Sequence, residues 1–513
     1  MKKSLFTIGC LLAVVMHSVA QAPAFPFPQH TVYTPGSIKP TVTTQAGLDK
    51  VVKQFYNKWK ARYIVNGCEP DEYYVYYNYE GGADPANAIS VSEGHGYGML
   101  ITALMAGYDA NAKVIFDGLF HYFEAHPSII NENLMAWQQT EGCEDVPGAD
   151  AATDGDLDIA YALLLAHAQW GSAGAINYLE EAITLINAIY TSEINHNNQT
   201  VKLGDWVSGS TSPMSYSTRS SDFMPDHFRS FYDATGDDVW NLTTDRCYSV
   251  TETIQTNFSS TTGLLCDFIR HTNTSPDPAA PNFLESPYDG AFYYNACRFP
   301  WRLATDYLIS GDTRAYEALT PVNDWIKTKT GSVPANIKSG YNITTGAVLA
   351  GSNYNDLAFQ APFAVSAMIS NTNQTWLNSL WNYMKTVNIN RDGYYGNSIK
   401  LLSLIVISGN WWAPDPDLFK QSASTNEPTA SISVYPNPIQ NNRVTVQFHS
   451  RSSELYTCEI RNMYGEIIQS NISGYAQAGT NQITIPLPDL ANGHYLIVIN
   501  TISEQYTGRF VKM

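Results

Sequence analysis

Through most of the chain, apolar residues recur at the spacing of an α-helix. Leu48, Val51, Val52, Phe55 and Trp59 form an i, i+3, i+4, i+7 stripe that fits one helix face. Comparable stripes occur in residues 99–105, 114–123, 159–170, 178–189, 298–309, 358–369 and 376–387. Loops rich in Gly, Asn, Asp and Ser separate them, and strand-like alternation is scarce here. The pattern predicts a large all-α domain of about a dozen helices with a loop-built cleft.

The pattern changes after Trp412. Residues 421–433 are rich in Ser, Thr and Pro, which is typical of a linker. Apolar and polar positions then alternate in residues 444–448, 456–460, 482–485 and 495–499. This part predicts a small β-sandwich of about 80 residues. The expected organisation is a helical domain at 45–414, a linker at 415–433 and a sandwich at 434–513.

The N-terminus has the features of an export signal. Lys2 and Lys3 precede an apolar run at 5–15, and small residues at 18–20 fit a cleavage site, so residues 1–20 predict a signal peptide. The run is too short to span a bilayer, and no other stretch reaches that length, so no stable membrane insertion is expected. Residues 21–44 are rich in proline and predict an extended arm along the surface.

Composition narrows the class of function. The formal net charge of −18 over 513 residues argues against nucleic acid, because phosphates need a basic surface. The chain is 12% aromatic, and polar aromatic side chains suit sugar faces as well as protein cores. Six cysteines lie outside the predicted signal peptide at spacings that match no zinc site, so we expect most of them to be buried thiols. No metal or cofactor is predicted.

A dense acidic cluster opens the stretch AATDGDLDIAYALLLAHAQWG, residues 151–171. Asp154, Asp156 and Asp158 crowd the start of a predicted helix, where the dipole favours negative charge, and Thr153 is the predicted N-cap. Alternating aspartates also open an EF-hand, but that loop needs Gly at its sixth position and Glu at its twelfth, which here are Ile and Leu. An EF-hand is excluded. Carboxylates at the mouth of a buried helix indicate a site.

A second candidate segment is Ser92-Glu-Gly-His-Gly-Tyr-Gly-Met99. Its alternate glycines predict a turn in which backbone can approach a ligand closely. The glycine spacing does not fit a dinucleotide-binding loop. The residues alone leave Glu93 open between a catalytic acid and a structural hydrogen-bonding group.

A third candidate segment is residues 283–302. It places Glu285 and Asp289 in a loop ahead of a helix that is expected to begin near residue 295. Arg298 and Arg302 follow one turn apart and can pair with carboxylates. For Arg302 we favour a structural ion pair.

Separated carboxylates in aromatic, glycine-rich segments of an exported acidic protein fit glycoside hydrolysis. That reaction needs one protonated carboxyl group to protonate the leaving oxygen and one ionised carboxylate. If the second group activates water, the two stand about 6.5–9.5 Å apart and the anomeric configuration inverts.

The three segments together resemble glycoside hydrolase family 8. Residues 152–170 are similar to the long family signature, and residues 92–99 and 295–302 to its two other characteristic segments, in the expected order. The resemblance implies an (α/α)6 barrel and an inverting endo-acting enzyme on β-1,4-linked polysaccharides. It implies that Glu93 is the general acid, that Asp154 holds and distorts the sugar ring, that Trp137 stacks on a sugar and that Arg298 orients a catalytic carboxylate. Asp156 and Asp158 are then expected to cap and brace the helix.

The chain departs from many family members at Asn295, where they carry the catalytic base as Asp. An amide cannot accept a proton from water, so either the site is inactive or the base lies elsewhere. The second alternative resembles the branch containing chitosanases and chitosanase-glucanases, whose base is a Glu ten residues earlier. That position is Glu285, with Asn295 helping to place it or the water, and Asp289 is the fallback. The expected substrates are chitosan, β-1,4-glucan or mixed-linkage β-glucan. The rival functions are a non-catalytic glycan-binding protein and, less favoured, a polysaccharide lyase.

The C-terminal part resembles another family. Tyr435-Pro-Asn-Pro, the segment at 489–495 and the terminal Phe510-Val-Lys-Met are similar to the C-terminal sorting domain of the type IX (Por) secretion system. The resemblance implies an interaction with the secretion machinery and export through the periplasm to the cell surface or medium. A carbohydrate-binding sandwich is the alternative, but it has no tryptophan for stacking. The expected partner of the helical domain is the polysaccharide, and the enzyme is expected to be a monomer.

Overall fold

The protein is described by a computed structural model covering residues 22–77, 87–209, 212–419, 432–439, 442–450, 453–462, 467–477, 479–501 and 505–512. The expected signal peptide at 1–20 and most of the expected linker lie outside these residues. The chain divides into two compact units after Pro416.

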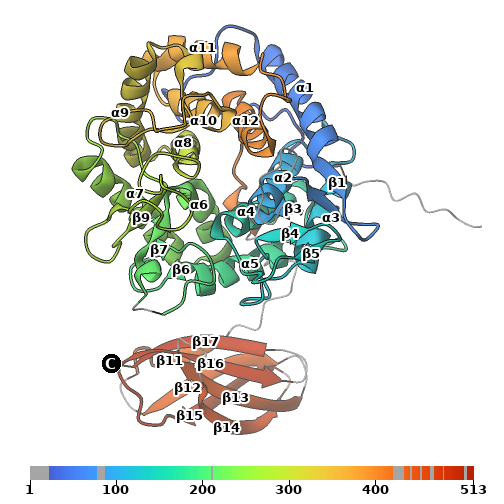
Figure 1. Ribbon diagram of the computed structural model, residues 1–513. Coiled ribbons are helices and arrows are strands. Elements are labelled where there is room, and N and C mark those ends of the chain that lie inside the picture. Colours follow the sequence, from blue (N-terminus) through green and yellow to red (C-terminus); the bar gives the residue numbers. More distant parts are fainter. Residues whose placement is uncertain are drawn as a thin grey trace, which may run out of the picture. The chain divides into compact units, whose positions relative to one another are not determined.

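The first unit is built from two concentric rings of helices (Figure 1). The inner helices are α2 (Ser92–Leu104), α4 (Thr153–Trp170), α6 (Pro225–Thr235), α8 (Phe299–Ser310), α10 (Leu357–Ala367) and α12 (Tyr394–Ile407). The outer helices are α1 (Gln45–Tyr63), α3 (Ala112–Ala125), α5 (Tyr178–Glu193), α7 (Val239–Asn257), α9 (Thr313–Thr330) and α11 (Gln374–Met384). Each inner helix packs on the next, and α12 packs back on α2, so the inner ring is closed.

The hydrophobic pattern explains which helices lie inside. Every residue of α4 and of α10 is buried, as expected for helices that are apolar nearly all round. The outer helix α1 instead buries one stripe that includes Leu48, Val52, Phe55 and Trp59, while its opposite face is polar. None of the described helices is long and apolar enough to cross a membrane.

Helices α2 and α4 approach each other closely because glycines line their contact. A Cβ atom on Gly155 would lie 2.6 Å from the carbonyl carbon of Ser92, and one on Gly96 would lie 2.6 Å from Cβ of Asp158. Both separations are shorter than van der Waals contact, so any larger residue would push the helices apart. The close packing brings together the first turns of α2 and α4, which carry Glu93 and Asp154.

The strands of this unit are short and lie in the loops between helices, in agreement with the scarcity of strand-like alternation in this part of the sequence. They are β1 (Ile64–Asn66), β2 (Tyr73–Val75), β3 (Ala88–Val91), β4 (Gln138–Thr140), β5 (Glu144–Asp145), β6 (Ile194–Asn195), β7 (Thr200–Val201), β8 (Thr218–Arg219), β9 (Phe268–Arg270) and β10 (Asp277–Pro278). They form two- and three-stranded antiparallel sheets, among them β10-β9-β8 and β3-β4-β5.

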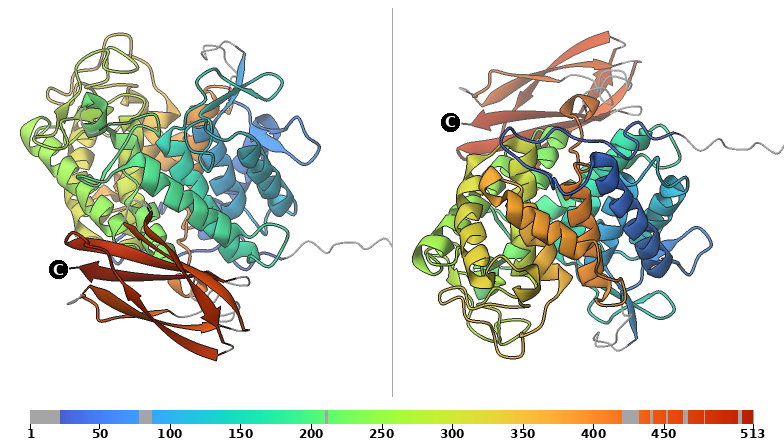
Figure 2. Two further views of the ribbon diagram at one scale, coloured as in Figure 1. Left: turned by 90° about the horizontal axis from the view of Figure 1, so that it is seen from below. Right: turned by 90° about the horizontal axis from the view of Figure 1, so that it is seen from above.

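The N-terminal arm runs across one end of the rings (dark blue, Figure 2). Its backbone N–H groups donate to carbonyls at the C-terminal ends of five inner helices: Ala24 to Gln169, Phe27 to Ala106, Thr31 to Gly409, Thr34 to Leu308 and Ile38 to Met368. These carbonyls have no partner within their own helices, so the arm supplies donors that helix ends require. The predicted surface arm is therefore an integral strap.

We expect Phe27→Ala to destabilise the first unit without changing its catalysis. The Phe27 side chain is buried, and truncating a buried Phe removes roughly 3–5 kcal/mol of stability in well-packed sites. Val32→Ala is the matched control, because Val32 lies on the same arm and is 95% exposed. Thermal unfolding should separate the two variants, whereas kcat at a permissive temperature should match the wild type in both. If kcat falls in Phe27→Ala under conditions where the protein is fully folded, this prediction is wrong.

The second unit contains two antiparallel sheets. One has the order β11-β12-β15 and the other β14-β13-β16-β17. The strands are β11 (Ser433–Tyr435), β12 (Arg443–Ser450), β13 (Glu454–Asn462), β14 (Ile467–Ala476), β15 (Gly479–Pro486), β16 (Gly493–Thr501) and β17 (Gln505–Lys512). Val446 and Phe448 from one sheet and Ile497 and Ile499 from the other belong to one hydrophobic core, as in a β-sandwich.

The cysteines divide into one disulfide and a set of thiols. Cys68 and Cys143 are bonded, with their Cα atoms 6.1 Å apart, and this pair joins the hairpin β1-β2 region to the β4-β5 turn. Cys247, Cys266, Cys297 and Cys458 are free and buried, which confirms the expectation for most of the cysteines. A disulfide is consistent with an oxidising compartment.

Candidate active site

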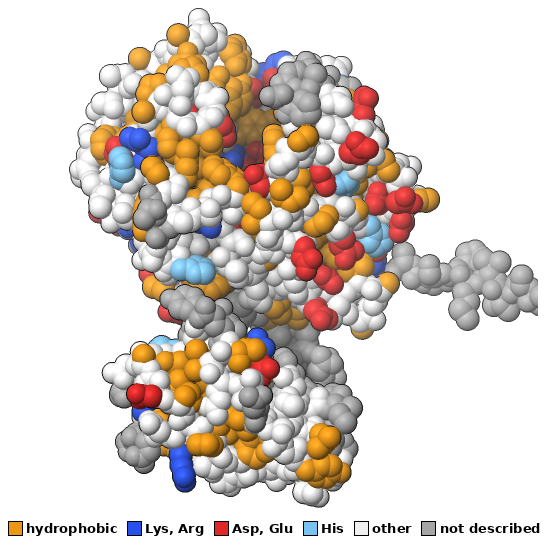
Figure 3. Space-filling model, turned by 60° about the horizontal axis from the view of Figure 1, so that its bottom comes forward, with side chains coloured by type: hydrophobic (Ala, Val, Ile, Leu, Met, Phe, Trp, Pro, Cys, Tyr) orange, Lys and Arg blue, Asp and Glu red, His pale blue; other side chains and the backbone are white. Residues whose placement is uncertain are grey.

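The candidate site lies at the N-terminal ends of the inner helices, opposite the end that the arm crosses. Glu93 sits in the first turn of α2, Asp154 in the first turn of α4, and Tyr394 at the first residue of α12. Arg298 ends the 3-10 helix η3 (Ala296–Arg298), which leads into α8. The face is hollowed there, with acidic and basic side chains in the hollow and hydrophobic side chains around it (Figure 3). Converging helix N-termini favour carboxylates.

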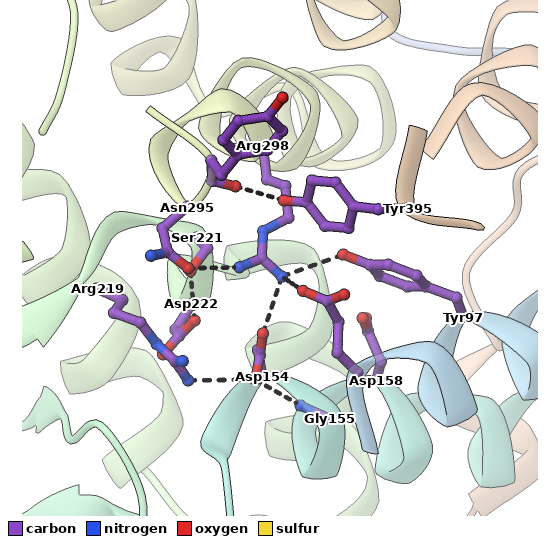
Figure 4. Close-up of polar contacts among 12 residues, drawn as sticks. Tyr97, Asp154, Gly155, Asp158, Arg219, Ser221, Asp222, Asn295, Arg298 and Tyr395 are labelled. Atoms are coloured by element: carbon purple, nitrogen blue, oxygen red, sulfur yellow. Dashed lines mark hydrogen bonds and ion pairs between the residues drawn. The ribbon is translucent and has the colours of Figure 1, made fainter. Parts of the chain in front are cut away.

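Arg298 is the centre of the site (Figure 4). Its Nη1 donates to Glu93 Oε2 at 2.6 Å, to Asp154 Oδ2 at 2.8 Å and to the Tyr97 hydroxyl at 3.1 Å. Its Nη2 donates to Asn295 Oδ1 at 3.0 Å. The guanidinium is buried and therefore held in one orientation by four partners.

Glu93 combines the burial and contacts that a proton donor needs. Burial raises its pKa to about 7, the nearby charge of Asp154 adds to this, and Arg298 and a hydrogen bond from Tyr394 oppose it. The Tyr394 hydroxyl donates to Oε1 while Arg298 occupies Oε2. The predicted glycine-rich turn was wrong in one respect: the segment is helical from Ser92, because its glycines face the neighbouring helix and buried side chains.

Asp154 is held between two arginines. Arg298 donates a hydrogen bond to Oδ2 of Asp154, and Arg219 Nη2 donates to Oδ1 at 3.1 Å. Burial alone would raise the pKa of Asp154, but the two guanidinium groups outweigh burial and hold the pKa below its usual value. Asp154 therefore stays ionised over a pH range, below about 7, in which Glu93 keeps its proton, and this is the division of states that one acid and one anionic partner require.

Asn295 connects this cluster to Glu285. Its Nδ2 donates to Glu285 Oε2 at 2.8 Å, while its Oδ1 accepts from Arg298. Glu285 lies in the loop before η3, and its residue is exposed. The two predicted catalytic carboxylates thus occupy the ends of a hydrogen-bonded chain, Glu93–Arg298–Asn295–Glu285. Behind Asn295, the buried Asp267 accepts from the N–H groups of Tyr293 and Ala296 and fixes the start of η3.

The remaining residues that the sequence singles out, Asp289 and Trp137, lie beside the loop of Glu285 and the start of α2. Asp289 is buried, and its carboxylate accepts from the backbone N–H groups of Leu284, Glu285 and Ser286, so it shapes the loop that carries Glu285. Trp137 is partly buried, and its backbone carbonyl accepts from Ser92 N–H beside the start of α2.

Two expectations for the acidic helix start were wrong. Ala152 is the N-cap of α4, Thr153 is its first residue, and no side chain caps it. Asp158 does not cap the helix either: it forms a two-bond ion pair with Arg302, at 2.8 and 2.6 Å, and bonds His227. The structural ion pair that the sequence favoured for Arg302 is confirmed, and it joins α4 to α8.

Asp156 takes part in a buried pair of carboxyl groups. Its Oδ1 accepts from Met135 N–H, and its carboxyl group lies within hydrogen-bonding reach of Glu193 at the end of α5. Both residues are fully buried, and burial raises the pKa of each well above its usual value. Among the described residues, no donor bonds Asp156 Oδ2 if both groups are ionised. The Thr153 hydroxyl lies within hydrogen-bonding reach of Glu193. A proton shared between Asp156 and Glu193 would supply a hydrogen bond between the two carboxyl groups.

We expect Asp156→Asn to stabilise the protein at alkaline pH. In the wild type the folded state holds a proton that the unfolded state releases above about pH 4, so stability falls as pH rises towards the raised pKa values. Asn keeps the acceptor for Met135 and supplies a permanent donor to Glu193. The unfolding free energy at pH 8 should rise by about 1 kcal/mol, and at pH 4 it should not change. Equal effects at both pH values would rule out a shared proton.

Sequence reasoning missed Arg219, Asp222, Tyr97 and Tyr394. Arg219 and Asp222 stand three residues apart just before α6, and that spacing was the available signal for a local ion pair. Nothing local linked Tyr394 to Glu93, which lies 301 positions away. In the described parts of the chain, no three His, Cys, Asp or Glu side chains are arranged to hold a metal ion.

The first unit is similar to a known enzyme family. Residues 39–409 match the family described as glycosyl hydrolases family 8. The chain belongs to glycosyl hydrolase family 8. Residues 433–513 match the secretion system C-terminal sorting domain, the tail that directs type IX export. The protein is therefore a glycoside hydrolase with a tail for the type IX machinery, which indicates a secreted or cell-surface location.

Relatives of this family 8 chain are glucanases. It is 48% identical over 391 residues to a β-glucanase of Niallia circulans, covering 76% of this chain and 92% of that protein. It is 41% identical over 405 residues to an endoglucanase of a Bacillus species, covering 78% and 84%. The apo structure of a β-1,3-1,4-glucanase from Paenibacillus sp. X4 matches with 47% identity and a TM-score of 0.72, covering 76% of this chain and 100% of that chain.

Proposed function

We propose that this family 8 enzyme is an exported endo-β-glucanase that cleaves β-1,4 bonds in mixed-linkage or cellulose-type β-glucan with inversion of the anomeric configuration. In this proposal Glu93 is the general acid and Glu285 the general base, as the sequence predicts. The observation that carries it is the chain Glu93–Arg298–Asn295–Glu285, which ties two carboxyl groups from distant segments to one arginine and one amide.

The surroundings of the two carboxyl groups support these roles. A pKa of about 7 leaves Glu93 protonated in mildly acidic solution, so it can protonate the leaving oxygen. Glu285 is exposed to solvent and accepts a hydrogen bond from Asn295, which leaves its other oxygen for a water molecule. In this proposal the base has moved from the position of Asn295 to Glu285.

The other candidate residues surround the sugar site in this proposal. Asp154, ionised between its arginines, would bind and distort the sugar ring next to the scissile bond, and Trp137 would stack on a sugar. Arg298 orients Glu93, and Asn295 orients Glu285. The two rings of helices would form an (α/α)6 barrel over residues 45–414, preceded by the signal peptide at 1–20 and the arm at 21–44, with a linker at 415–433 and the sorting domain at 434–513.

The substrate is best tested by comparing sugar release from barley β-glucan, carboxymethyl-cellulose and chitosan. We expect β-glucan to be cleaved fastest, because relatives with 47 and 48% identity are glucanases. Proton NMR of the first product should show the α-anomer from a β-linkage. Faster release from chitosan would assign the enzyme to the chitosanase alternative, and a β-anomer would exclude the inverting mechanism.

The rival function is glycan binding without hydrolysis. It predicts Glu285 far from the cleft, whereas here Glu285 is bonded to Asn295, a direct neighbour of Arg298. Saturable oligosaccharide binding with no sugar release by the intact protein would nevertheless establish it.

A further inference from the structure

Arg219 occupies the side of Asp154 that Arg298 leaves free. It ends β8, directly before the 3-10 helix η2 (Ser220–Asp222). Its Nη2 donates to Asp154 Oδ1 at 3.1 Å, and the same oxygen accepts from Gly155 N–H at 3.1 Å. With Arg298 on Oδ2, both oxygens of the Asp154 carboxylate are directed by protein donors (Figure 4).

Arg219 is itself fixed in place. Its Nε donates to Asp222 Oδ2 at 3.1 Å, and its Nη2 also approaches the carbonyl of Leu203 at 3.4 Å. Asp222 is fully buried and accepts a hydrogen bond from the Ser221 hydroxyl at 2.7 Å. The side chain of Arg219 is only 10% exposed. A buried arginine between two carboxylates is preorganised before any substrate enters.

We infer that Arg219 is a positioning residue for the glucanase reaction, acting through Asp154, and that Asp222 sets the strength of its action. Arg219 fixes the orientation and the ionised state of the carboxylate that meets the sugar. The inference rests on the proposed function, because it needs a role for Asp154 at the sugar ring.

The charges around Asp154 predict the direction in which the pKa of Glu93 should shift when Arg219 or Asp222 is replaced. The charged groups facing Asp154 are Glu93 from α2, Arg298 from η3, Arg302 from α8, Arg219 from β8, Asp222 from η2 and Asp156 on its own helix. Arg219 lowers the pKa values of Asp154 and Glu93. Removing its charge should raise the pKa of Glu93, and removing the opposing charge of Asp222 should lower it.

The test is the pH profile of kcat on β-glucan for the wild type, Arg219→Gln and Asp222→Asn, all as the full chain. Deprotonation of Glu93 ends activity on the alkaline side. We expect this alkaline limb to move up by about one pH unit in Arg219→Gln. In Asp222→Asn it should move down by a smaller amount, because burial raises the pKa of Asp222 and favours its uncharged form. Arg219→Lys keeps the charge, so its limb should stay near the wild-type position although kcat falls, because Lys cannot bridge both carboxylates.

A double-mutant cycle tests whether the action passes through Asp154. Arg219→Gln should lower kcat at least tenfold in the wild-type background and have little further effect when Asp154 is already Asn. Arg229→Gln is the matched control, because Arg229 also bridges two carboxylates, Asp306 and Asp312, away from the site. It should lower the melting temperature without moving the alkaline limb.

Two results would overturn the inference. One is a limb that moves in the same direction in Arg219→Gln and Asp222→Asn. The other is a tenfold kcat loss from Arg219→Gln that persists in the Asp154→Asn background. If the wild type is active, either result contradicts the role of Arg219 and leaves the glucanase proposal unchanged. If the wild type releases no sugar from β-glucan, the glucanase proposal itself is contradicted.

Discussion

Glu93→Gln is expected to lower kcat on β-glucan by roughly three orders of magnitude, within the range that general acid catalysis contributes. Gln is nearly isosteric: its oxygen can accept the hydrogen bond from Arg298, and its NH2 group can donate to the Tyr394 hydroxyl, so the fold and substrate binding should be kept. It cannot deliver a proton to the leaving oxygen. Steady-state kinetics should show a loss in kcat, a small change in KM and an unchanged melting temperature.

The pH dependence follows from the same group. Burial raises the pKa of Glu93 to about 7, so wild-type kcat should fall as pH rises through about 7 and the acid loses its proton. In Glu93→Gln this alkaline limb should disappear. An aryl oligosaccharide with an activated leaving group needs no protonation, so it should restore turnover in this variant. Failure of that substrate to restore turnover would mean that Glu93 does not act as the acid.

Glu285→Gln is expected to cause a loss of similar size for a different reason. The amide cannot accept a proton from the attacking water, although it can keep the hydrogen bond from Asn295. An activated leaving group should not restore this variant, because the missing step is the activation of water. Azide, which attacks without losing a proton, should restore turnover and give a glycosyl azide of inverted configuration.

Asp289→Asn is the control for the base. Its carboxylate binds three backbone N–H groups of the same loop, so this variant should lose stability and retain more activity than Glu285→Gln. If Glu285→Gln keeps a near-wild-type rate and Asp289→Asn does not, the base is Asp289 and the assignment is wrong.

The helices were predictable because their apolar positions carry the signal locally. The stripe from Leu48 to Trp59 lies within α1, and the alternating runs at 444–448 and 495–499 lie within β12 and β16. The edge strand β14 had no such signal, since Ile467 and Ile468 at its start are exposed. The predicted cap at Thr153 failed because the backbone of β-bridged Ala151 and of Ala152 already sets the helix start, and Thr153 is buried inside it.

The site was only partly predictable for a similar reason. Acidic residues at a helix start and a loop carboxylate ten positions before an amide are visible in a linear sequence. The contacts that set the protonation states of these carboxyl groups join segments far apart in the sequence, such as Tyr394 with Glu93 and Arg219 with Asp154. Those contacts depend on closure of the helix ring, which no single segment encodes. The helical state of the Glu93 segment was missed because its glycines serve close helix packing instead of a turn.

The strap at the base of the rings also constrains the order of folding. Gln29 N–H donates to Asn410 Oδ1, a hydrogen bond between residues 381 positions apart, and Thr31 N–H donates to the Gly409 carbonyl. Such contacts form only after α12 exists and has docked between α10 and α2. Closing so long a loop costs conformational entropy, and other contacts compensate for that cost only when the ring of helices is nearly complete. The N-terminal arm therefore reaches its final position only after α12 has docked, so the first unit cannot complete its fold before residue 410 is in place.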